Sequence, residues 1–302
     1  MTAPFVANPY SPPTPFKARA YSLPLHSRVH LMGILNVTPD SFSDGGRFLA
    51  PDAAVAHALA MVEAGADIID IGAESTRPGS TPVDEREEIR RLIPVVREVC
   101  RRVSVPISVD TTKASVAKLA LEVGASIIND ISALRNDVEM GSVVAEAGAG
   151  LVLMHAQGPP QTMQQAPTYH DVVAEVRQFL AERARTALEF HISPAQIMLD
   201  PGIGFGKNLD HNLTLLAHVP ELVSLGYPLL VGVSRKAFIG QVLGRPVEQR
   251  TMGTAAASAM AILGGARVIR VHDVGAVRDV VTMIEAIRRR QRHPSPAYQD
   301  PS

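Results

Sequence analysis

Short runs of consecutive apolar residues recur along the whole chain, and each run is followed by a polar or glycine-containing loop. Runs that are apolar throughout, rather than alternating with polar residues, are typical of strands buried on both faces of a sheet. The pattern therefore predicts eight strands, at Val29–Leu35, Ile68–Gly72, Ile107–Asp110, Ile127–Asp130, Leu151–His155, Ile197–Asp200, Leu229–Ser234 and Val268–Val271.

The segments between these runs have the periodicity of helices. From Ile89 to Val103, apolar residues recur at the three- and four-residue spacing of one helical stripe, and we expect Pro94 to kink this helix. Further helices are predicted at Ala53–Ala64, Ser115–Val123, Asp137–Glu146, Val172–Phe190, Leu213–Leu225, Thr254–Leu263 and Val274–Arg290.

Glycine-alanine pairs mark four junctions between a helix and the next strand: Gly65-Ala66, Gly124-Ala125, Gly148-Ala149 and Gly265-Ala266. Glycine at such a position can take the left-handed conformation that ends a helix. The alternation of strand and helix predicts a parallel sheet, and eight strands favour its closure into a single-domain α/β fold, the (β/α)8 TIM barrel. A doubly wound open sheet is the alternative, because periodicity alone does not distinguish the two.

The length of 302 residues fits one barrel, which typically needs about 250 residues. We assign residues 28–291 to the barrel. Residues 1–27 are rich in proline and are expected to form a flexible N-terminal arm, and residues 292–302 form a C-terminal tail.

Composition and charge exclude several classes of function. A net charge of −1 gives no broad electrostatic footprint for nucleic acid. The most apolar stretch, Thr254–Ala266, is too short and too rich in Gly and Ala to span a membrane, and the N-terminus lacks the apolar core of a signal peptide. A single cysteine, Cys100, excludes an intramolecular disulfide and agrees with a reducing compartment, so we expect a cytoplasmic protein.

Polar residues accumulate where the predicted strands end, and in a barrel these ends meet at one mouth. For a single residue such as Asp110, capping of the following helix is an equally good explanation. Capping does not account for Lys, Arg and His, which disfavour helix N-termini. The residues predicted at this mouth are Asn36, Asp110, Asn129, His155, Asp200, Lys236, Arg270 and His272.

The segment from Pro201 to Lys207 is rich in glycine and follows a strand. Its glycine spacing matches neither a Walker A loop nor a dinucleotide-binding fingerprint. We expect it to bring backbone and the Phe205 ring close to a flat ligand, with a plain tight turn as the alternative. The sequence contains neither the spacing of a metal cage nor a G-x-S-x-G nucleophile elbow.

The residue types at the mouth favour a heterocycle and an anion as ligands. Asp110 and Asp200 offer acceptors, Asn129 offers a donor and an acceptor, and Lys236 offers a cationic donor, which together suit an amino-lactam edge. A second set suits a phosphate group, and it comprises Asn36, Arg77, Arg270 and His272. Two long polar loops, Thr38–Phe48 and Ser75–Val83, can close over such a site.

The chain resembles the dihydropteroate synthase family of folate biosynthesis, over roughly residues 30 to 290. The first two matching stretches are long and specific, running from Met32 to Gly46 and from Gly65 to Gly79. Shorter matches follow in order: Ile107–Thr111, Ile128–Asp130, Leu153–His155, Asp200–Lys207, Gly232–Lys236 and Arg270–Asp273.

The resemblance implies a role for each matching residue. The implied pterin-binding residues are Asp110, Asn129, Asp200, Lys236, Met154, Gly204 and Phe205. The implied diphosphate-binding residues are Asn36, Thr76, Arg77, Arg270 and His272. The residues implied to border 4-aminobenzoate are Phe42, Thr76, Pro78, Phe205, Ser234 and Lys236, and the catalytic set is Asn36, Asp110, Lys236 and Arg270.

The resemblance also implies the reaction, in which 6-hydroxymethyl-7,8-dihydropterin diphosphate and 4-aminobenzoate give 7,8-dihydropteroate and diphosphate. Mg2+ is the implied cofactor, with Asn36 as its candidate protein ligand, and a dissociative, SN1-like step is expected. A homodimer and sensitivity to sulfonamides are expected as well. The alternatives are a non-catalytic pterin-binding barrel or one of the methyltransferase type.

Overall fold

The computed structural model describes residues 15–37, 46–74, 83–158 and 162–292. Eight parallel strands form one sheet with the order β8-β7-β6-β5-β4-β3-β10-β9. A parallel bridge between Leu199 and Leu229 joins the two ends of this order, so that the sheet closes on itself. The predicted (β/α)8 barrel is therefore confirmed, and the open sheet is excluded.

The strands of the barrel lie where the apolar runs predicted them. Their bounds are β3 His30–Asn36, β4 Ile68–Gly72, β5 Ile107–Asp110, β6 Ile127–Asp130, β7 Gly150–Met154, β8 Ile197–Asp200, β9 Leu230–Val231 and β10 Val268–Val271. Nearly every residue in them is buried, as strands covered on both faces require. β9 is shorter than predicted because the chain leaves the sheet at Gly232 and turns at Arg235, whose φ is 57°.

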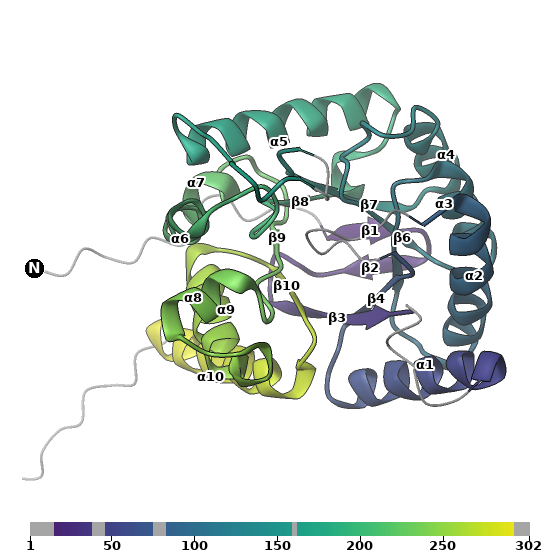
Figure 1. Cartoon of the computed structure of the whole chain (residues 1–302), viewed down its shortest axis with the longest axis horizontal. Helices are drawn as coiled ribbons and strands as arrows, with labels where there is room; N and C mark the ends of the chain where they lie inside the picture. Colours follow the sequence, from purple (N-terminus) through teal and green to yellow (C-terminus); the bar gives the residue numbers. More distant parts are fainter. Residues whose placement is uncertain (1–14, 38–45, 75–82, 159–161, 293–302) are drawn as a thin grey trace, which may run out of the picture.

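Helices surround the strands as an outer ring (Figure 1). Their bounds are α1 Gly46–Glu63, α2 Glu85–Arg102, α3 Ala114–Glu122, α4 Met140–Ala147, α5 Val172–Glu189, α6 Leu209–Ala217, α7 Val219–Val223, α8 Ala237–Leu243, α9 Thr251–Gly264 and α10 Val274–Arg292. The four predicted junction glycines all have positive φ. Within the described ranges, no helix is long and apolar enough to cross a membrane.

One helical prediction needs correction, and one helix was missed. The predicted helix Leu213–Leu225 is two helices, α6 and α7, because Pro220 at the start of α7 cannot continue the α6 hydrogen-bond ladder. Helix α8 was not predicted, since it has seven residues and several of them are exposed, which leaves little apolar periodicity to detect.

Part of the N-terminal arm is ordered, which corrects the expectation of flexibility for residues 15–27. β1 Phe16–Ala18 and β2 Tyr21–Leu23 form an antiparallel hairpin. Its inward side chains join the apolar residues that fill the lower barrel, in one cluster of Phe16, Ala18, Leu23, Leu25, Met32, Ile68, Ile127, Val152, Met198, Leu230 and Val268. The hairpin therefore closes the N-terminal end of the barrel. Residues 1–14 lie outside the described ranges.

The barrel interior changes from apolar to polar along its axis. Side chains two residues apart on a strand point the same way. Two residues beyond the apolar layer, at positions 70, 129, 200 and 270, the strands carry Asp70, Asn129, Asp200 and Arg270. With the lower end closed by the hairpin, these polar groups face the C-terminal mouth, where barrel enzymes place their active sites.

The cysteine is a packing residue, as its place in a helical stripe suggested. Cys100 packs against Gly124, where an added Cβ would lie 3.2 Å from its sulfur. Burial raises the pKa of the Cys100 thiol to about 11. It therefore has little thiolate at neutral pH, and this argues against a reactive role.

Candidate active site

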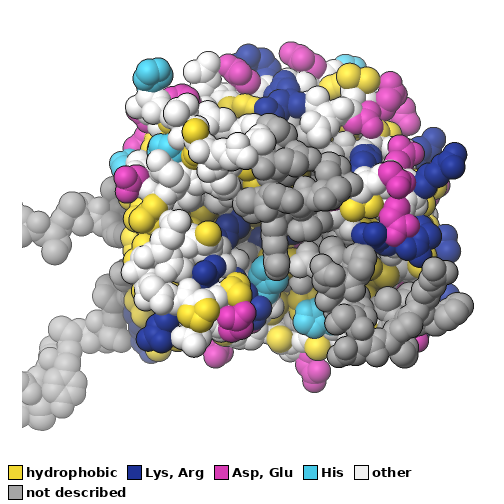
Figure 2. Space-filling view, in the orientation of Figure 1, with side chains coloured by type: hydrophobic (Ala, Val, Ile, Leu, Met, Phe, Trp, Pro, Cys, Tyr) yellow, Lys and Arg dark blue, Asp and Glu magenta, His cyan; other side chains and the backbone are white. Residues whose placement is uncertain are grey.

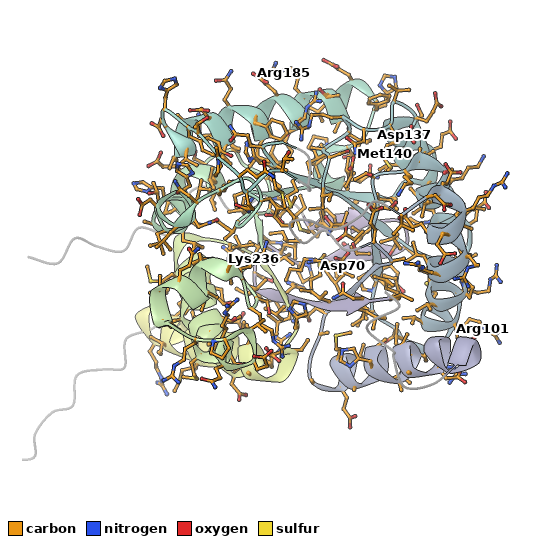
Figure 3. All side chains as sticks on the ribbon, viewed as in Figure 1. Asp70, Arg101, Asp137, Met140, Arg185 and Lys236 are labelled. Atoms are coloured by element: carbon orange, nitrogen blue, oxygen red, sulfur yellow. The ribbon has the colours of Figure 1, made fainter. Side chains whose placement is uncertain are left out.

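The barrel brings most of the predicted site residues to one end. Asn36, Asp110, Met154 and Asp200 are the last residues of β3, β5, β7 and β8, and Lys236 immediately precedes α8. In Figure 3, Lys236 and Asp70 lie inside the ring of helices, whereas Arg101 and Arg185 lie on its outside. The site is therefore built from several strand ends rather than from one local motif.

Arg270 is held between two carboxylates in the barrel interior. Its Nε donates to Asp70 Oδ2 at 2.6 Å, and its second guanidinium nitrogen donates to Asp110 Oδ2 at 3.0 Å. Asp70 is fully buried, and Arg270 exposes 19% of its side chain. Charge-assisted bonds from a rigid guanidinium fix its plane. Arg270 thus stands oriented at the floor of the mouth.

Asp110 is a buried carboxyl whose pKa is raised toward neutral pH. Burial raises its pKa to about 7, although the Arg270 guanidinium beside it acts in the opposite direction, and the neighbouring Asp70 carboxylate adds to the rise. Space beside it comes from Gly72 in the adjacent strand, where a Cβ would lie 3.4 Å from the Cβ of Asp110. A group with this pKa can be charged or neutral near neutral pH, which is common at functional sites.

Asn129 is oriented by the same buried carboxylate. Its Nδ2 donates to Asp70 Oδ2 at 3.1 Å. Its Oδ1 is buried and has no hydrogen-bond partner among the described residues. A buried acceptor without a partner is costly, so Oδ1 is available to a donor on a ligand.

The glycine-rich segment packs around two lysines. Lys236 Nζ donates to Ile203 O and lies 4.0 Å from the centroid of the Phe205 ring. Burial lowers the pKa of Lys236 to about 7, with the Asp200 carboxylate opposing this effect. Asp200 Oδ1 in turn accepts from Gly202 N at 2.7 Å. The segment therefore brings Phe205 to the mouth, as predicted for a flat ligand.

Lys207 forms hydrogen bonds within the glycine-rich segment from its buried side. It is almost completely buried, and its Nζ donates to the carbonyl oxygens of Gly202 and Phe205, each at 3.0 Å. It also lies 2.9 Å from His155 Nδ1. Burial holds the pKa of Lys207 well below its usual value. His155, predicted at the mouth, thus serves the packing of this segment.

Ser234 and His272 form a further part of the rim. Ser234 Oγ accepts from the backbone N–H of His272 at 3.1 Å and lies 3.0 Å from its Nδ1. The serine is buried and the histidine is half-buried. Arg270 lies in β10, whereas His272 is the first residue after its end, so the predicted alternation along one strand applies only to Arg270.

Four predicted site residues, Phe42, Thr76, Arg77 and Pro78, lie outside the described residues. Conversely, sequence reasoning missed Asp70 as a site residue and gave Lys207 no separate role. A signal for Asp70 was present, because a carboxylate inside the apolar run Ile68–Gly72 requires a buried partner. Lys207 gave a weaker signal, since a lysine after a glycine-rich turn is ordinarily exposed.

The fold defines a (β/α)8-barrel enzyme, and its strand ends bring together two carboxylates, an amide and two cations. The family model described as "Pterin binding enzyme" matches residues 32–272, which is most of the barrel. The chain therefore belongs to the pterin-binding enzymes and, within them, to the dihydropteroate synthases, which are transferases.

The relatives support this assignment over nearly their full length. The chain is 48% identical to the dihydropteroate synthase of Synechocystis sp. over 263 residues, which is 87% of this chain and 91% of that one. The structure of Xanthomonas albilineans dihydropteroate synthase with 4-aminobenzoic acid has a TM-score of 0.86 at 45% identity, covering 95% of this chain and 100% of that one. The structure of the same enzyme in complex with 7,8-dihydropteroate has a TM-score of 0.83 at 42% identity, and the match covers 93% of this chain and 100% of that one.

Proposed function

We propose that this chain condenses 6-hydroxymethyl-7,8-dihydropterin diphosphate with 4-aminobenzoate to give 7,8-dihydropteroate and diphosphate. The observation that carries the proposal is one hydrogen-bonded network at the barrel mouth, in which the buried Asp70 carboxylate accepts from Asn129 and Arg270, and Arg270 also donates to Asp110. Relatives with 4-aminobenzoic acid or 7,8-dihydropteroate bound add support. A non-catalytic pterin-binding barrel has no need of an oriented cation beside these acceptors.

The pterin is assigned to the inner part of the site. Acceptors on Asp110, Asn129 and Asp200 suit its N–H groups, and the Lys236 ammonium suits its carbonyl oxygen. Met154, Gly204 and Phe205 supply the apolar and close-packed walls. Gly204 suits this place because its φ is +84° and a Cβ there would lie 2.7 Å from Lys236 Cδ.

The diphosphate is assigned to the cationic side of the mouth, where Arg270 and His272 are half-buried on β10 and just beyond it. Asn36 at the end of β3 completes this group among the described residues, because β3 and β10 are hydrogen-bonded neighbours. Thr76 and Arg77 belong to the same proposed subsite. A phosphate group favours such a combination of a guanidinium and polar donors.

The 4-aminobenzoate is assigned to the outer rim, against Phe205, Ser234 and Lys236. Phe205 offers a ring face, and Ser234 offers a hydroxyl that is already held beside His272. Phe42, Thr76 and Pro78 belong to this proposed subsite as well. The aniline nitrogen then approaches the pterin methylene from the solvent side of the pocket.

Asn36 fits a magnesium ion that arrives with the diphosphate. Mg2+ usually keeps several waters and takes one or two protein ligands in addition to substrate phosphates. The described residues contain no cluster of three or more His, Cys, Asp or Glu side chains that could hold a metal. Asn36 is half-buried at a strand end and is paired with Gly72 of β4, which has no side chain of its own. When bound, the ion would neutralise charge on the leaving diphosphate.

The reaction needs no protein nucleophile. The bond between the pterin methylene carbon and the diphosphate oxygen breaks, and its electron pair leaves with the diphosphate, where Arg270 stabilises the developing charge. The Asp110 carboxylate stabilises the electron-poor pterin methylene. The aniline nitrogen of 4-aminobenzoate then forms the new C–N bond with its lone pair and releases one proton to solvent. This sequence is SN1-like.

A turnover assay with mass detection tests the proposed reaction. Dihydropteroate is expected when the protein receives the pterin diphosphate, Mg2+ and 4-aminobenzoate, and is expected to be absent when any one is omitted. EDTA should abolish product formation, and excess Mg2+ should restore it. Saturable binding of the pterin diphosphate without any product would instead favour a non-catalytic pterin-binding barrel.

We further propose that the chain forms a homodimer through α9 and α10. These helices pack together and expose Met252, Met260 and Leu263 from α9 and Met283 and Ile287 from α10. Hydrophobic side chains are visible over this region in Figure 2. Sedimentation should give the mass of two chains for the wild type and of one chain for Met260→Glu. A monomeric wild type at micromolar concentration would refute this assembly.

A further inference from the structure

Asp70 occupies the centre of the site without being exposed to it. Its relative exposure is 0%. One carboxylate oxygen, Oδ2, accepts from both Arg270 Nε and Asn129 Nδ2, while Oδ1 has no hydrogen-bond partner among the described residues. A fully buried carboxylate is unfavourable unless it is paired, so its presence calls for a compensating role.

The position of Asp70 in the barrel lets it reach both partners. In the strand order β6-β5-β4-β3-β10, its strand β4 lies midway between β6, which carries Asn129, and β10, which carries Arg270. Side chains from alternate strands share one layer inside such a barrel. Asp70 thus joins two groups that lie two strands away on either side of it.

The contact with Asp70 decides which end of the Asn129 amide faces the ligand. Asp70 Oδ2 accepts from Arg270 Nε and from the Asn129 amide nitrogen, so the nitrogen end of the amide points toward Asp70. Oδ1 of Asn129 is then left as the outward group, buried and without a partner among the described residues. Asn129 therefore presents an acceptor, which suits an N–H donor of the heterocycle.

The contact with Arg270 has a comparable effect on the guanidinium. Two of its nitrogens are held by carboxylates on different strands, and these two bonds define the plane of the group. If the Asp70 carboxylate is removed by substitution, the remaining carboxylate partner of Arg270 is Asp110. The guanidinium could then rotate about its bond to Asp110, and its alignment toward an anion would be lost.

We propose that Asp70 is a positioning residue, which orients the Asn129 amide and the Arg270 guanidinium while Asp70 itself touches neither substrate. This inference rests on the proposed function, because the substrate groups it concerns belong to the same site. It assigns to Asn129 the recognition of an N–H donor on the pterin. It also explains why a charged residue interrupts the apolar run of β4.

The test is a double-mutant cycle on binding of 6-hydroxymethyl-7,8-dihydropterin, measured by titration calorimetry. This ligand lacks the diphosphate, so it isolates the route through Asn129. Asp70→Asn should weaken binding at least tenfold, since its carboxamide no longer imposes one orientation on Asn129. In an Asn129→Ala background the same substitution should change affinity less than threefold, because the group that Asp70 orients is already gone.

A second variant probes the contact from its other side. Asn129→Asp retains an acceptor for the ligand but removes the donor that faces Asp70. If Asp70 positions residue 129, this variant should lose at least tenfold in pterin affinity. If residue 129 needs only to offer an acceptor, it should bind like the wild type, and the proposal would be overturned. This arm applies even where Asp70→Asn does not fold.

Asp130→Asn is the matched control. Asp130 is equally buried and lies on β6, yet its carboxylate bonds Ser132 N, Ser132 Oγ and Leu134 N in the following loop. It should lower the thermal midpoint and leave pterin affinity within twofold of wild type. The inference would be overturned, and the proposed function left intact, by either of two results. One is wild-type pterin affinity in Asp70→Asn. The other is an equal loss of pterin affinity on Asp70→Asn in the wild-type and Asn129→Ala backgrounds. A wild type that neither binds pterin nor turns over would overturn the proposed function as well.

Discussion

Replacing Asp110 with asparagine should stabilise the ligand-free protein while it abolishes turnover. The Asp110 carboxyl is buried beside a second carboxylate, and its pKa rises from 3.8 to about 7 in the fold. The folded chain therefore holds this proton more tightly than the unfolded chain does. Asparagine resembles the neutral form in shape, so it removes the cost of ionising a carboxyl at this place.

The size of the effect follows from the pKa. Below pH 3.8 both states are protonated and no cost arises. Between 3.8 and about 7, stability falls by about 1.4 kcal/mol per pH unit, because the unfolded chain has already released the proton. Above the folded pKa, the cost levels off at about 4 kcal/mol. Between pH 5 and pH 8, Asp110→Asn should therefore gain about 3 kcal/mol relative to wild type.

Urea unfolding of both proteins at pH 5, 6, 7 and 8 measures this difference. The unfolding free energy is expected to fall by about 3 kcal/mol for each molar increase in urea. The difference between the two unfolding midpoints should therefore widen by about 1 M between pH 5 and pH 8. Asp279→Asn is a suitable control, since it removes an exposed carboxylate on α10. The difference between its urea midpoint and that of the wild type should not widen with pH. If the difference for Asp110→Asn stayed constant or narrowed as pH rose, the reasoning about its burial would be refuted.

Four further predictions concern three sites in the described structure and one class of inhibitor. Lys236→Ala removes the contacts to Ile203 O and the Phe205 ring. It should lower kcat/KM by a factor that corresponds to a loss of about 1.5–3 kcal/mol in transition-state stabilisation. Wild-type kinetics would refute the assigned role. Gly202→Ala should cost at least about 3 kcal/mol in unfolding free energy, because its φ is +63° and a Cβ would lie 1.8 Å from His155 O. Gly244→Ala, with the same φ and open space around it, should cost only about 1 kcal/mol, and equal losses would exclude the clash as the cause. Phe16→Ala should lower urea stability by about 3–5 kcal/mol and leave kcat unchanged, since the hairpin lies at the end remote from the site. Sulfonamides should inhibit turnover competitively with 4-aminobenzoate, given Phe42 and Pro78, and unchanged turnover under excess drug would contradict this.

Much of the barrel could be predicted because its strands are buried on both sides. Such strands appear in the sequence as uninterrupted apolar runs, and seven of the eight predicted ends lie within one residue of the observed ones. The run at Leu229–Ser234 misled because Val233 is buried outside the sheet, in the turn toward Lys236. The hairpin at Phe16–Leu23 escaped prediction because each strand has three residues and its apolar partners lie far away in sequence.

The site was predictable where chemistry and position coincide. Asp110, Asp200 and Arg270 stand at or near strand ends, which a barrel brings together by construction. Asp70 stands in the middle of its strand, so position gave no reason to choose it, and its partners are 59 and 200 residues away. Such pairings depend on the order and stagger of strands around the barrel, which local periodicity does not contain.

The hairpin has a practical consequence for measuring ligands. Because Phe16–Leu23 seals the end of the barrel opposite the strand termini, the chain enters the fold on the side away from the mouth. A surface tether attached at Lys17, which is exposed on the hairpin, would hold the molecule with its mouth directed outward. Immobilised in this way, the protein should report drug and substrate binding without the support blocking access.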